Sequence, residues 1–195
     1  MAAVVALTAC SDSSTETKAP APEKPLDPIT GRQAFQYTYP AARGWAQDAE
    51  PVLVRSINLD EVKSAGGRAG AWEVSFVSMS RGAAKVYTWS AIEGQGSLHK
   101  GVFGGPEQSW REGSQERPFM AAAFRIDTPE ALKTAVSNSA EYLDTPGKKP
   151  PVTFWLESTP RFPNPTWRVL WGASVGSAEH QVFIDASMGT ILGKQ

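Results

Sequence analysis

The sequence contains the same strand pattern twice, and this repeat limits the folds that the chain can adopt. One copy reads Ala-Trp-Glu-Val-Ser-Phe from Ala71, and the other reads Thr-Trp-Arg-Val-Leu-Trp from Thr166. A short polar turn and a second run with valine and an aromatic residue follow each copy, at Val86-Tyr87 and at Val182-Phe183. Apolar residues at every second position are typical of a strand with one buried face. The chain is therefore expected to contain two antiparallel hairpins of the same design.

A strand-like run and a helical pattern precede each hairpin. The runs 51–57 and 151–157 are rich in β-branched and aromatic residues, which favour strands. The patterns 30–45 and 128–143 place apolar residues three or four positions apart, which indicates amphipathic helices. Pro40 lies inside the first pattern, and we expect it to kink or split that helix because proline removes a backbone N–H and crowds the preceding turn.

Both helical patterns begin at capping residues. Thr30 and Gln33 have the spacing of a capping box, in which each side chain accepts a hydrogen bond from the other residue's backbone N–H. The second helix is expected to begin at Asp127 or Thr128, with Pro129 in its first turn.

The two halves are therefore expected to be copies of one unit, a helix followed by three antiparallel strands. This organisation belongs to the α+β class, with each helix packed on an antiparallel sheet. We expect the first unit to span 30–105 and the second 119–195, joined by a polar connector at 106–118. Residues 11–29 are rich in proline, serine and charged side chains, a composition that is typical of a disordered tether.

The end of the second half resembles the end of PepSY-type domains. Those domains finish with Val-x-Val-Asp-Ala-x-Thr-Gly-x-Val, and this chain has Ile184-Asp185-Ala186 and Gly189 in the matching places, while Ser187-Met188 departs from the pattern. Asp185 is expected to accept hydrogen bonds from downstream amides and Gly189 to adopt a positive φ, so that the chain reverses into a last strand. The first half lacks this aspartate and shares the resemblance only through the repeat. The resemblance implies a PepSY-like or cystatin-like layout and a non-catalytic role in modulating extracytoplasmic peptidases or other envelope proteins.

Leu7-Thr8-Ala9-Cys10 resembles the lipobox of bacterial lipoproteins. In that family the cysteine thiol is lipidated, the preceding peptide is removed and the cysteine becomes the new N-terminus. The resemblance implies that residues 1–10 are part of a lipoprotein signal. They lack the charged start and the length of a whole signal peptide, so either the start codon lies upstream or the chain begins within the signal. Ser11 then favours the periplasmic side of the outer membrane, whereas the alternative is an apolar N-terminus with an incidental cysteine.

The composition excludes several classes of protein. Lys and Arg number 19 and Asp and Glu number 20, for a net charge of −1, so the chain lacks the excess of cations that nucleic-acid binding needs. Cys10 is the only cysteine, which rules out an intrachain disulfide and a multi-cysteine metal site. No run of about 18 apolar residues occurs, so the sequence predicts no membrane-spanning helix.

The residues that carry chemistry form no recognisable catalytic or metal-binding pattern. The two histidines, His99 and His180, are expected in solvated turns and lack the spacing of metal ligands. Asp60 and Glu61 have the character of solvated turn charges, and no Gly-x-Ser-x-Gly elbow is present. The sequence therefore predicts no cofactor, no metal and no enzyme activity. A hydrolase with a catalytic site dispersed between the units is one alternative, since triads converge only in space, and a structural assembly subunit is another.

Seven tryptophans are the one compositional excess. The repeat gives four of them a place in the core: Trp45, Trp72, Trp167 and Trp171. The other three, Trp89, Trp110 and Trp155, could line an open sheet face that binds a peptide, a glycan or a partner protein, unless both sheet faces are buried. We therefore expect a non-catalytic, lipid-anchored protein of the cell envelope that binds or modulates an envelope protein or peptide. The sequence does not indicate its oligomeric state.

Overall fold

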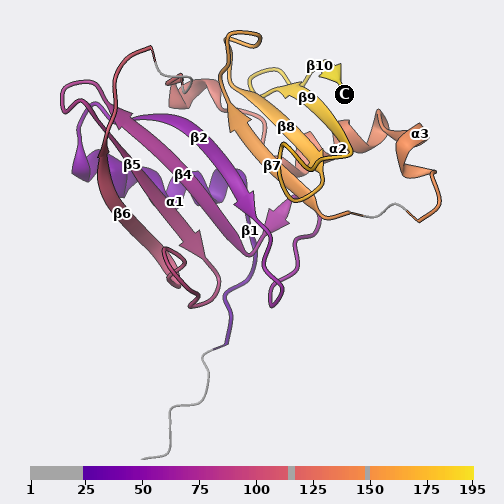
Figure 1. The fold of residues 1–195 in the computed structure, drawn as a ribbon, viewed down its shortest axis with the longest axis horizontal. Helices are drawn as coiled ribbons and strands as arrows, with labels where there is room; N and C mark the ends of the chain where they lie inside the picture. The colour runs from indigo at the N-terminus through magenta and orange to yellow at the C-terminus, as the bar shows by residue number, and fades with distance from the viewer. Residues whose placement is uncertain (1–23, 114–116, 148–149) are drawn as a thin grey trace, which may run out of the picture.

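The computed structural model describes residues 24–113, 117–147 and 150–195. The first half contains, in order, β1 (Ile29–Thr30), α1 (Gly31–Trp45), β2 (Glu50–Ile57), β3 (Arg68–Ala69), β4 (Ala71–Ser78), β5 (Ala83–Ser90) and β6 (Gly101–Ser109). The second half contains the 3₁₀ helix η1 (Ala121–Ala123), α2 (Thr128–Ser137), α3 (Ala140–Leu143), β7 (Val152–Glu157), β8 (Thr166–Trp171), β9 (His180–Asp185) and β10 (Ile191–Lys194). Within these residues, eight strands form one antiparallel sheet in the order β10-β9-β8-β7-β2-β4-β5-β6, and β1 pairs with β3. The helices α1 and α2 lie on one face of the large sheet (Figure 1).

The strand order places the two halves of the chain symmetrically about the centre of the sheet. β2 and β7 pair in the middle, with Leu53 opposite Glu157 and Arg55 opposite Trp155. From this pair outward, β4 and β8, β5 and β9, and β6 and β10 occupy equivalent places. The predicted α+β class, with helices packed on an antiparallel sheet, is confirmed. The symmetry is what a repeated unit would produce, although a common origin of the two halves stays a prediction.

Each half contributes four strands to the sheet instead of the three that the hairpin pattern predicts. β6 ends at Ser109 and therefore extends into the segment 106–118, which the sequence predicts to be a connector. Pro106 is tolerated there because β6 is an edge strand and its register with β5 shifts between the partners of Lys85 and Tyr87.

The fourth strand of the second half follows the turn that the sequence predicts. Asp185 Oδ1 accepts hydrogen bonds from the backbone N–H groups of Ser187 at 2.7 Å and Met188 at 3.0 Å. Gly189 adopts a φ of 75°, a conformation that glycine reaches without steric cost. These contacts confirm the structural role predicted for Asp185 and Gly189, and they turn the chain from β9 into β10.

Helix α1 runs through its proline without interruption. Its start is confirmed, since Thr30 and Gln33 form both hydrogen bonds of a capping box. The expectation that Pro40 splits the helix is wrong, because the helix continues to Trp45. Pro40 and Gln36, whose carbonyl loses its helical donor, are both exposed, so water can satisfy the free carbonyl.

The second helical pattern forms two helices rather than one. α2 begins after Asp127, which is its N-cap, and ends at Ser137, and α3 covers only the last turn of the predicted helix. At the break, the Asn138 side chain donates to the carbonyl of Thr134, and Ser139 Oγ donates to that of Ala135. Such side-chain bonds compete with regular helical hydrogen bonding and explain the interruption.

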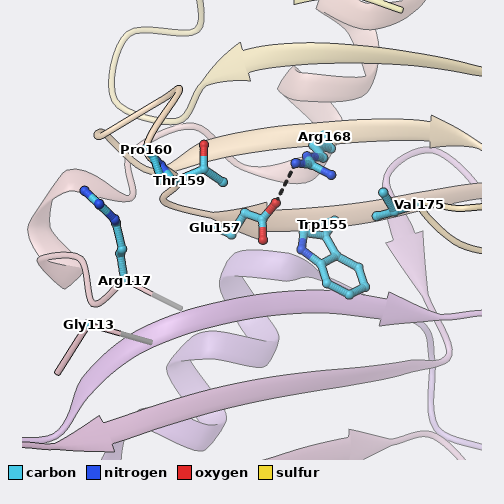
Figure 2. A pocket seen from close by; sticks show the side chains of 8 residues that line it. All are labelled: Gly113, Arg117, Trp155, Glu157, Thr159, Pro160, Arg168 and Val175. Carbon is cyan, nitrogen blue, oxygen red and sulfur yellow. Dashed lines mark ion pairs between the residues drawn. The ribbon is translucent and has the colours of Figure 1, made fainter. Parts of the chain in front are cut away.

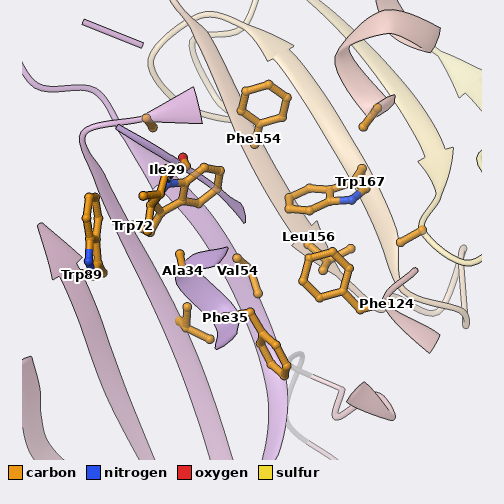
Figure 3. Packing of buried hydrophobic residues seen from close by; sticks show 14 of the residues in the cluster. Ile29, Ala34, Phe35, Val54, Trp72, Trp89, Phe124, Phe154, Leu156 and Trp167 are labelled. Atoms are coloured by element: carbon orange, nitrogen blue, oxygen red, sulfur yellow. Dashed lines mark hydrogen bonds between the residues drawn. The ribbon is translucent and has the colours of Figure 1, made fainter. Parts of the chain in front are cut away.

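Trp72 and Trp167 lie at the centre of the core between the sheet and the helices (Figure 3). Both side chains are 0% exposed. The Trp72 indole N–H donates to the carbonyl of Ile29 at 3.0 Å, and the Trp167 indole N–H donates to that of Ile126 at 2.8 Å. Each acceptor directly precedes the N-cap of a helix, so the two halves hold their helix starts with the same contact.

The N-termini of α1 and α2 meet beside this core. Asp127 Oδ1 accepts from the backbone N–H groups of Thr128 at 2.7 Å and Arg32 at 3.0 Å, so one carboxylate caps both helices. The Gly31 N–H donates to Thr128 Oγ1 at 3.0 Å. A Cβ at Gly31 would lie 2.9 Å from the Trp167 ring of β8 and 3.0 Å from Thr128 Cγ2 of α2, so glycine allows α1 to approach both elements closely.

Candidate functional site

The three tryptophans predicted to form a binding surface lie on two different faces of the sheet. Trp89 of β5 lies opposite Trp72 of the neighbouring strand β4. Its side chain is 5% exposed and belongs to the core beneath the helices. Trp110 and Trp155 belong to a cluster on the opposite face, which we call the open face because none of the described helices covers it. Trp110 is 7% exposed, and Trp155 is only partly buried. The predicted lipidation site, Cys10, lies outside the described residues.

A row of charged and aromatic side chains crosses the open face beside Trp155. The strand register puts Arg55 of β2 opposite Trp155, Trp155 opposite Arg168 of β8, and Arg168 opposite Phe183 of β9. The Arg55 guanidinium carbon lies 5.3 Å from the centre of the Trp155 ring, and that of Arg168 lies 5.3 Å from the centre of the Phe183 ring. At this distance a cation is attracted to the face of an aromatic ring, so the row is ordered by its own contacts.

Two acidic side chains hold the arginines of this row. Arg55 pairs with Glu73 at 2.8 Å, and Arg168 pairs with Glu157 at 3.0 Å. The exposed fractions of the Arg168 and Glu157 side chains are 22% and 23%, so this pair is shielded from bulk water but still reachable. Both arginines keep further N–H groups beyond those that these ion pairs use.

A cavity of about 580 Å³ opens over the Arg168–Glu157 pair (Figure 2). Figure 2 shows the pair at the centre, Trp155 on one side and Arg117 at the far end. The loops after β6, β7 and β8 form its walls together with the strands, and its lining residues are Gly113, Arg117, Trp155, Glu157, Thr159, Pro160, Arg168 and Val175.

Two further cavities adjoin this one along the open face. One of about 340 Å³ shares Trp155 and also contains Arg55. The other, of about 480 Å³, shares Arg168 and extends to Arg161 and Phe183. We call the three cavities together the open-face groove.

The open-face groove presents more hydrogen-bond donors and more positive charge than its own residues satisfy. Among the described residues that line it, four are arginines, namely Arg55, Arg117, Arg161 and Arg168, whereas Glu157 is the one acidic side chain. Neither Arg117 nor Arg161 pairs with a carboxylate of the part of the chain that the structure describes. Trp155 Nε1 and Arg55 Nε are buried and have no acceptor among those residues. The groove can therefore donate hydrogen bonds to carbonyl or carboxylate oxygens of a ligand.

A serine and a histidine form a close pair elsewhere, in the second half. Ser139 Oγ lies 2.9 Å from His180 Nε2 and also donates to the carbonyl of Ala135. His180 is not the solvated turn residue that the sequence predicts: it begins β9 and stacks on Tyr142, because the α2–α3 break brings that ring over it. Burial lowers the pKa of His180, so the neutral imidazole is favoured. Ser139 is 3% exposed and lines none of these three cavities.

The other histidine and the acidic residues have local roles. His99 is exposed and pairs with Glu93. Asp60 pairs with Lys63 in an exposed loop, at 3.2 Å. Among residues 24–113, 117–147 and 150–195, no three His, Cys, Asp or Glu side chains are grouped in a way that could hold a metal ion. Over the same ranges, no helix has the length and apolar character needed to span a membrane.

Comparisons with known proteins find one similar fold and no similar sequence. No family model and no curated protein matches the chain. A crystal structure of a putative lipoprotein from Clostridium difficile 630 superposes with a TM-score of 0.56, over 89% of this chain and 99% of that one. The two sequences are 10% identical, so the likeness concerns the fold.

Proposed function

We propose that the chain is a non-catalytic binding protein of the cell envelope, which is anchored by a lipid on Cys10 and binds a protein or peptide partner through the open-face groove. The observation that carries the binding role is the set of arginines that line cavities open to solvent, of which Arg117 and Arg161 pair with no carboxylate among the described residues. A guanidinium group donates several hydrogen bonds, so these side chains favour a ligand that supplies carbonyl or carboxylate oxygens.

The anchor is proposed from the first residues of the chain. Leu7-Thr8-Ala9-Cys10 resembles a lipobox, and the proline- and serine-rich residues that follow it have the composition of a tether that would separate the folded part from a bilayer. The predicted tether, 11–29, is too long at its C-terminal end, because the Leu26 N–H donates to the carbonyl of Ala91 and Ile29 is a buried residue of β1. The similar protein from Clostridium difficile carries the name putative lipoprotein, which supports the same proposal. Ser11 favours attachment to the periplasmic side of the outer membrane.

Metabolic labelling with a palmitate analogue tests the anchor. The precursor, expressed with a complete signal sequence upstream, should incorporate the label, and Cys10→Ser should abolish it because the thiol is the acceptor. Ser11→Ala serves as the matched control and should keep the label. An unlabelled precursor, or equal labelling of the Cys10→Ser variant, would rule out the anchor.

A tandem PepSY-like organisation is part of this proposal. The equivalent places of the strands in the two halves support a duplicated unit, as do the equivalent contacts of Trp72 and Trp167. A PepSY-like role implies that the partner is a peptidase or another regulated protein of the envelope.

Site-specific photo-crosslinking in the native cells tests the binding role. A photoreactive residue in place of Val175, which lines the open-face groove, should yield a discrete adduct. The same residue in place of Tyr37, which is 55% exposed on α1 at the other face, should yield none. Equal yields at the two positions, or no adduct at Val175, would contradict the proposed binding face.

A further inference from the structure

The open-face groove has the charge and the hydrogen-bonding groups to select one class of ligand. We infer that it binds a peptide segment carrying at least two carboxylate side chains. The inference rests on the proposed function and names the chemistry of the partner.

The open-face groove carries positive charge that its described carboxylates do not neutralise. Arg168 lines two adjoining cavities and is neutralised by Glu157 at 3.0 Å. Arg117 lines one of these cavities and Arg161 the other, and neither pairs with a carboxylate among the described residues. Two arginines without a carboxylate partner among the described residues therefore line the two cavities that share Arg168. A ligand with two separated carboxylates complements this arrangement.

The arginines of the groove also supply hydrogen-bond donors for the backbone of a ligand. Arg55, Arg117, Arg161 and Arg168 each carry several N–H groups, and the carbonyl groups of a peptide backbone are acceptors at regular spacing. Phe183 and Val175 add apolar surface against which aliphatic parts of a peptide can pack.

The position of Glu157 distinguishes a peptide from a phosphate-rich ligand such as an anionic lipid surface. Glu157 lies in the middle of the groove, where its carboxylate would repel the phosphodiester anions of such a surface. The same carboxylate can accept N–H groups of a peptide backbone. The alternation of arginine with Glu157 and Trp155 thus fits a peptide with separated charges better than a continuous anionic surface.

Selection of a displayed random heptapeptide library on the full chain, kept unlipidated by Cys10→Ser, tests the inference. We expect Asp and Glu to be enriched about threefold or more in the selected peptides. For the best of them, Arg117→Gln and Arg161→Gln should each weaken the dissociation constant about two- to fivefold, as for partly exposed ion pairs, and the preference should fade in high salt. Glu157→Gln should act in the opposite direction and tighten binding, because it removes a negative charge that faces the carboxylates of the ligand, whereas the amide oxygen can still accept a backbone N–H.

The matched control is Arg43→Gln, which removes an exposed arginine on α1, on the other side of the sheet, and should leave the affinity unchanged. Near-ultraviolet circular dichroism of each variant verifies that it is folded. Selected peptides without acidic enrichment would overturn the inference, as would equal effects of Arg43→Gln and Arg117→Gln.

Binding to vesicles of phosphatidylglycerol tests the alternative ligand, an anionic lipid surface. Sedimentation with these vesicles that depends on Arg117 and Arg161, without acidic enrichment in the peptides, would assign the groove to a lipid surface and overturn the peptide. The proposed binding role fails separately: an adduct from Val175 with no acidic preference would retain the binding face and reject only this ligand class.

Discussion

At the scale of single residues, Asp127 has the most extended structural role. Its carboxylate accepts from one backbone N–H group in the first turn of each helix, that of Arg32 in α1 at 3.0 Å and that of Thr128 in α2 at 2.7 Å. Because the N-terminus of a helix carries a partial positive charge, the two facing N-termini would repel each other without an anion between them. Asp127 therefore stabilises the packing of the two helices as well as the start of each.

Asp127→Ala should lower the free energy of unfolding by about 1–3 kcal/mol, because it removes a cap from two helices and the charge between them. Urea unfolding followed by circular dichroism measures this loss. Asp60→Ala is the matched control, since Asp60 forms one exposed ion pair with Lys63, and its effect should stay within about 0.5 kcal/mol. Equal losses in the two variants would mean that Asp127 is not a shared cap.

Asp48 gives the protein a defined dependence on pH. Its carboxylate accepts from Ser78 Oγ at 2.6 Å and from the Ser80 N–H at 2.8 Å. These bonds lower the pKa of Asp48 from 3.8 to about 2, with the Ser78 bond the largest cause. The native state therefore holds fewer protons than the unfolded chain in this range. The stability from Asp48 is fully present above about pH 4 and is lost as the pH falls through about 2.

Comparing the melting temperatures of the wild type and the variant Asp48→Asn at several pH values should reveal this dependence. The melting temperature of the wild type should exceed that of the variant by a constant amount between about pH 7 and pH 5. The gap should narrow from about pH 4 toward pH 2, because the wild-type carboxyl becomes protonated there. A gap that is independent of pH would show that ionisation of Asp48 does not contribute to stability.

Residue-scale features were predictable where the partners are close in sequence. The Thr30–Gln33 capping box and the Asp185–Gly189 turn both join residues within four positions of each other, so the spacing alone reveals them. The environment of His180 could not be predicted, since Ser139 and Tyr142 reach it from about 40 positions away.

At the scale of elements, the same type of hydrogen bond joins a strand to the start of a helix in both halves. Trp72 of β4 and Trp167 of β8 each donate an indole N–H to the carbonyl that precedes a helix cap. Trp72→Phe and Trp167→Phe should therefore destabilise the protein by similar amounts, about 2–4 kcal/mol each, since each leaves a buried carbonyl unpaired and a small cavity.

Denaturant unfolding of both variants measures this equivalence. Trp45→Phe is the control: its indole N–H bonds Glu107 in an exposed position, so the loss should stay below about 1 kcal/mol. Losses that differ by more than about 2 kcal/mol between Trp72→Phe and Trp167→Phe would show that the two contacts are not equivalent in energy.

The sequence predicts which residues alternate on a strand but does not reveal which face the helices will cover. Trp89 and Trp155 both lie in alternating strands, yet Trp89 is in the core under α1 and Trp155 is on the open face. The open-face groove was not predicted from the sequence for the same reason, although the sequence contains one indication of it. Arg168 takes the place in its repeat that Glu73 takes in the other, and both point away from the buried tryptophans beside them.

At the scale of the whole molecule, the halves are joined by contacts of long range. β2 pairs with β7, the Phe154 N–H donates to Ser56 Oγ at 2.9 Å, and the Phe119 N–H donates to the carbonyl of Pro51 at 2.9 Å. No local pattern encodes this pairing, because either half could present a different strand to its neighbour. The pairing of β2 with β7, and with it the order of the strands in the shared sheet, therefore could not be predicted from the sequence.

The shared sheet and the shared helix cap predict that the two halves unfold together. Separating them would expose the edges of β2 and β7 and leave backbone groups of both unpaired, so a half-folded state is disfavoured. Differential scanning calorimetry should give one transition whose calorimetric and van't Hoff enthalpies agree. Trp72→Phe in the first half and Trp167→Phe in the second should each lower the temperature of that one transition. Two transitions, with only one shifted by each variant, would instead identify two independently stable units that merely share an edge.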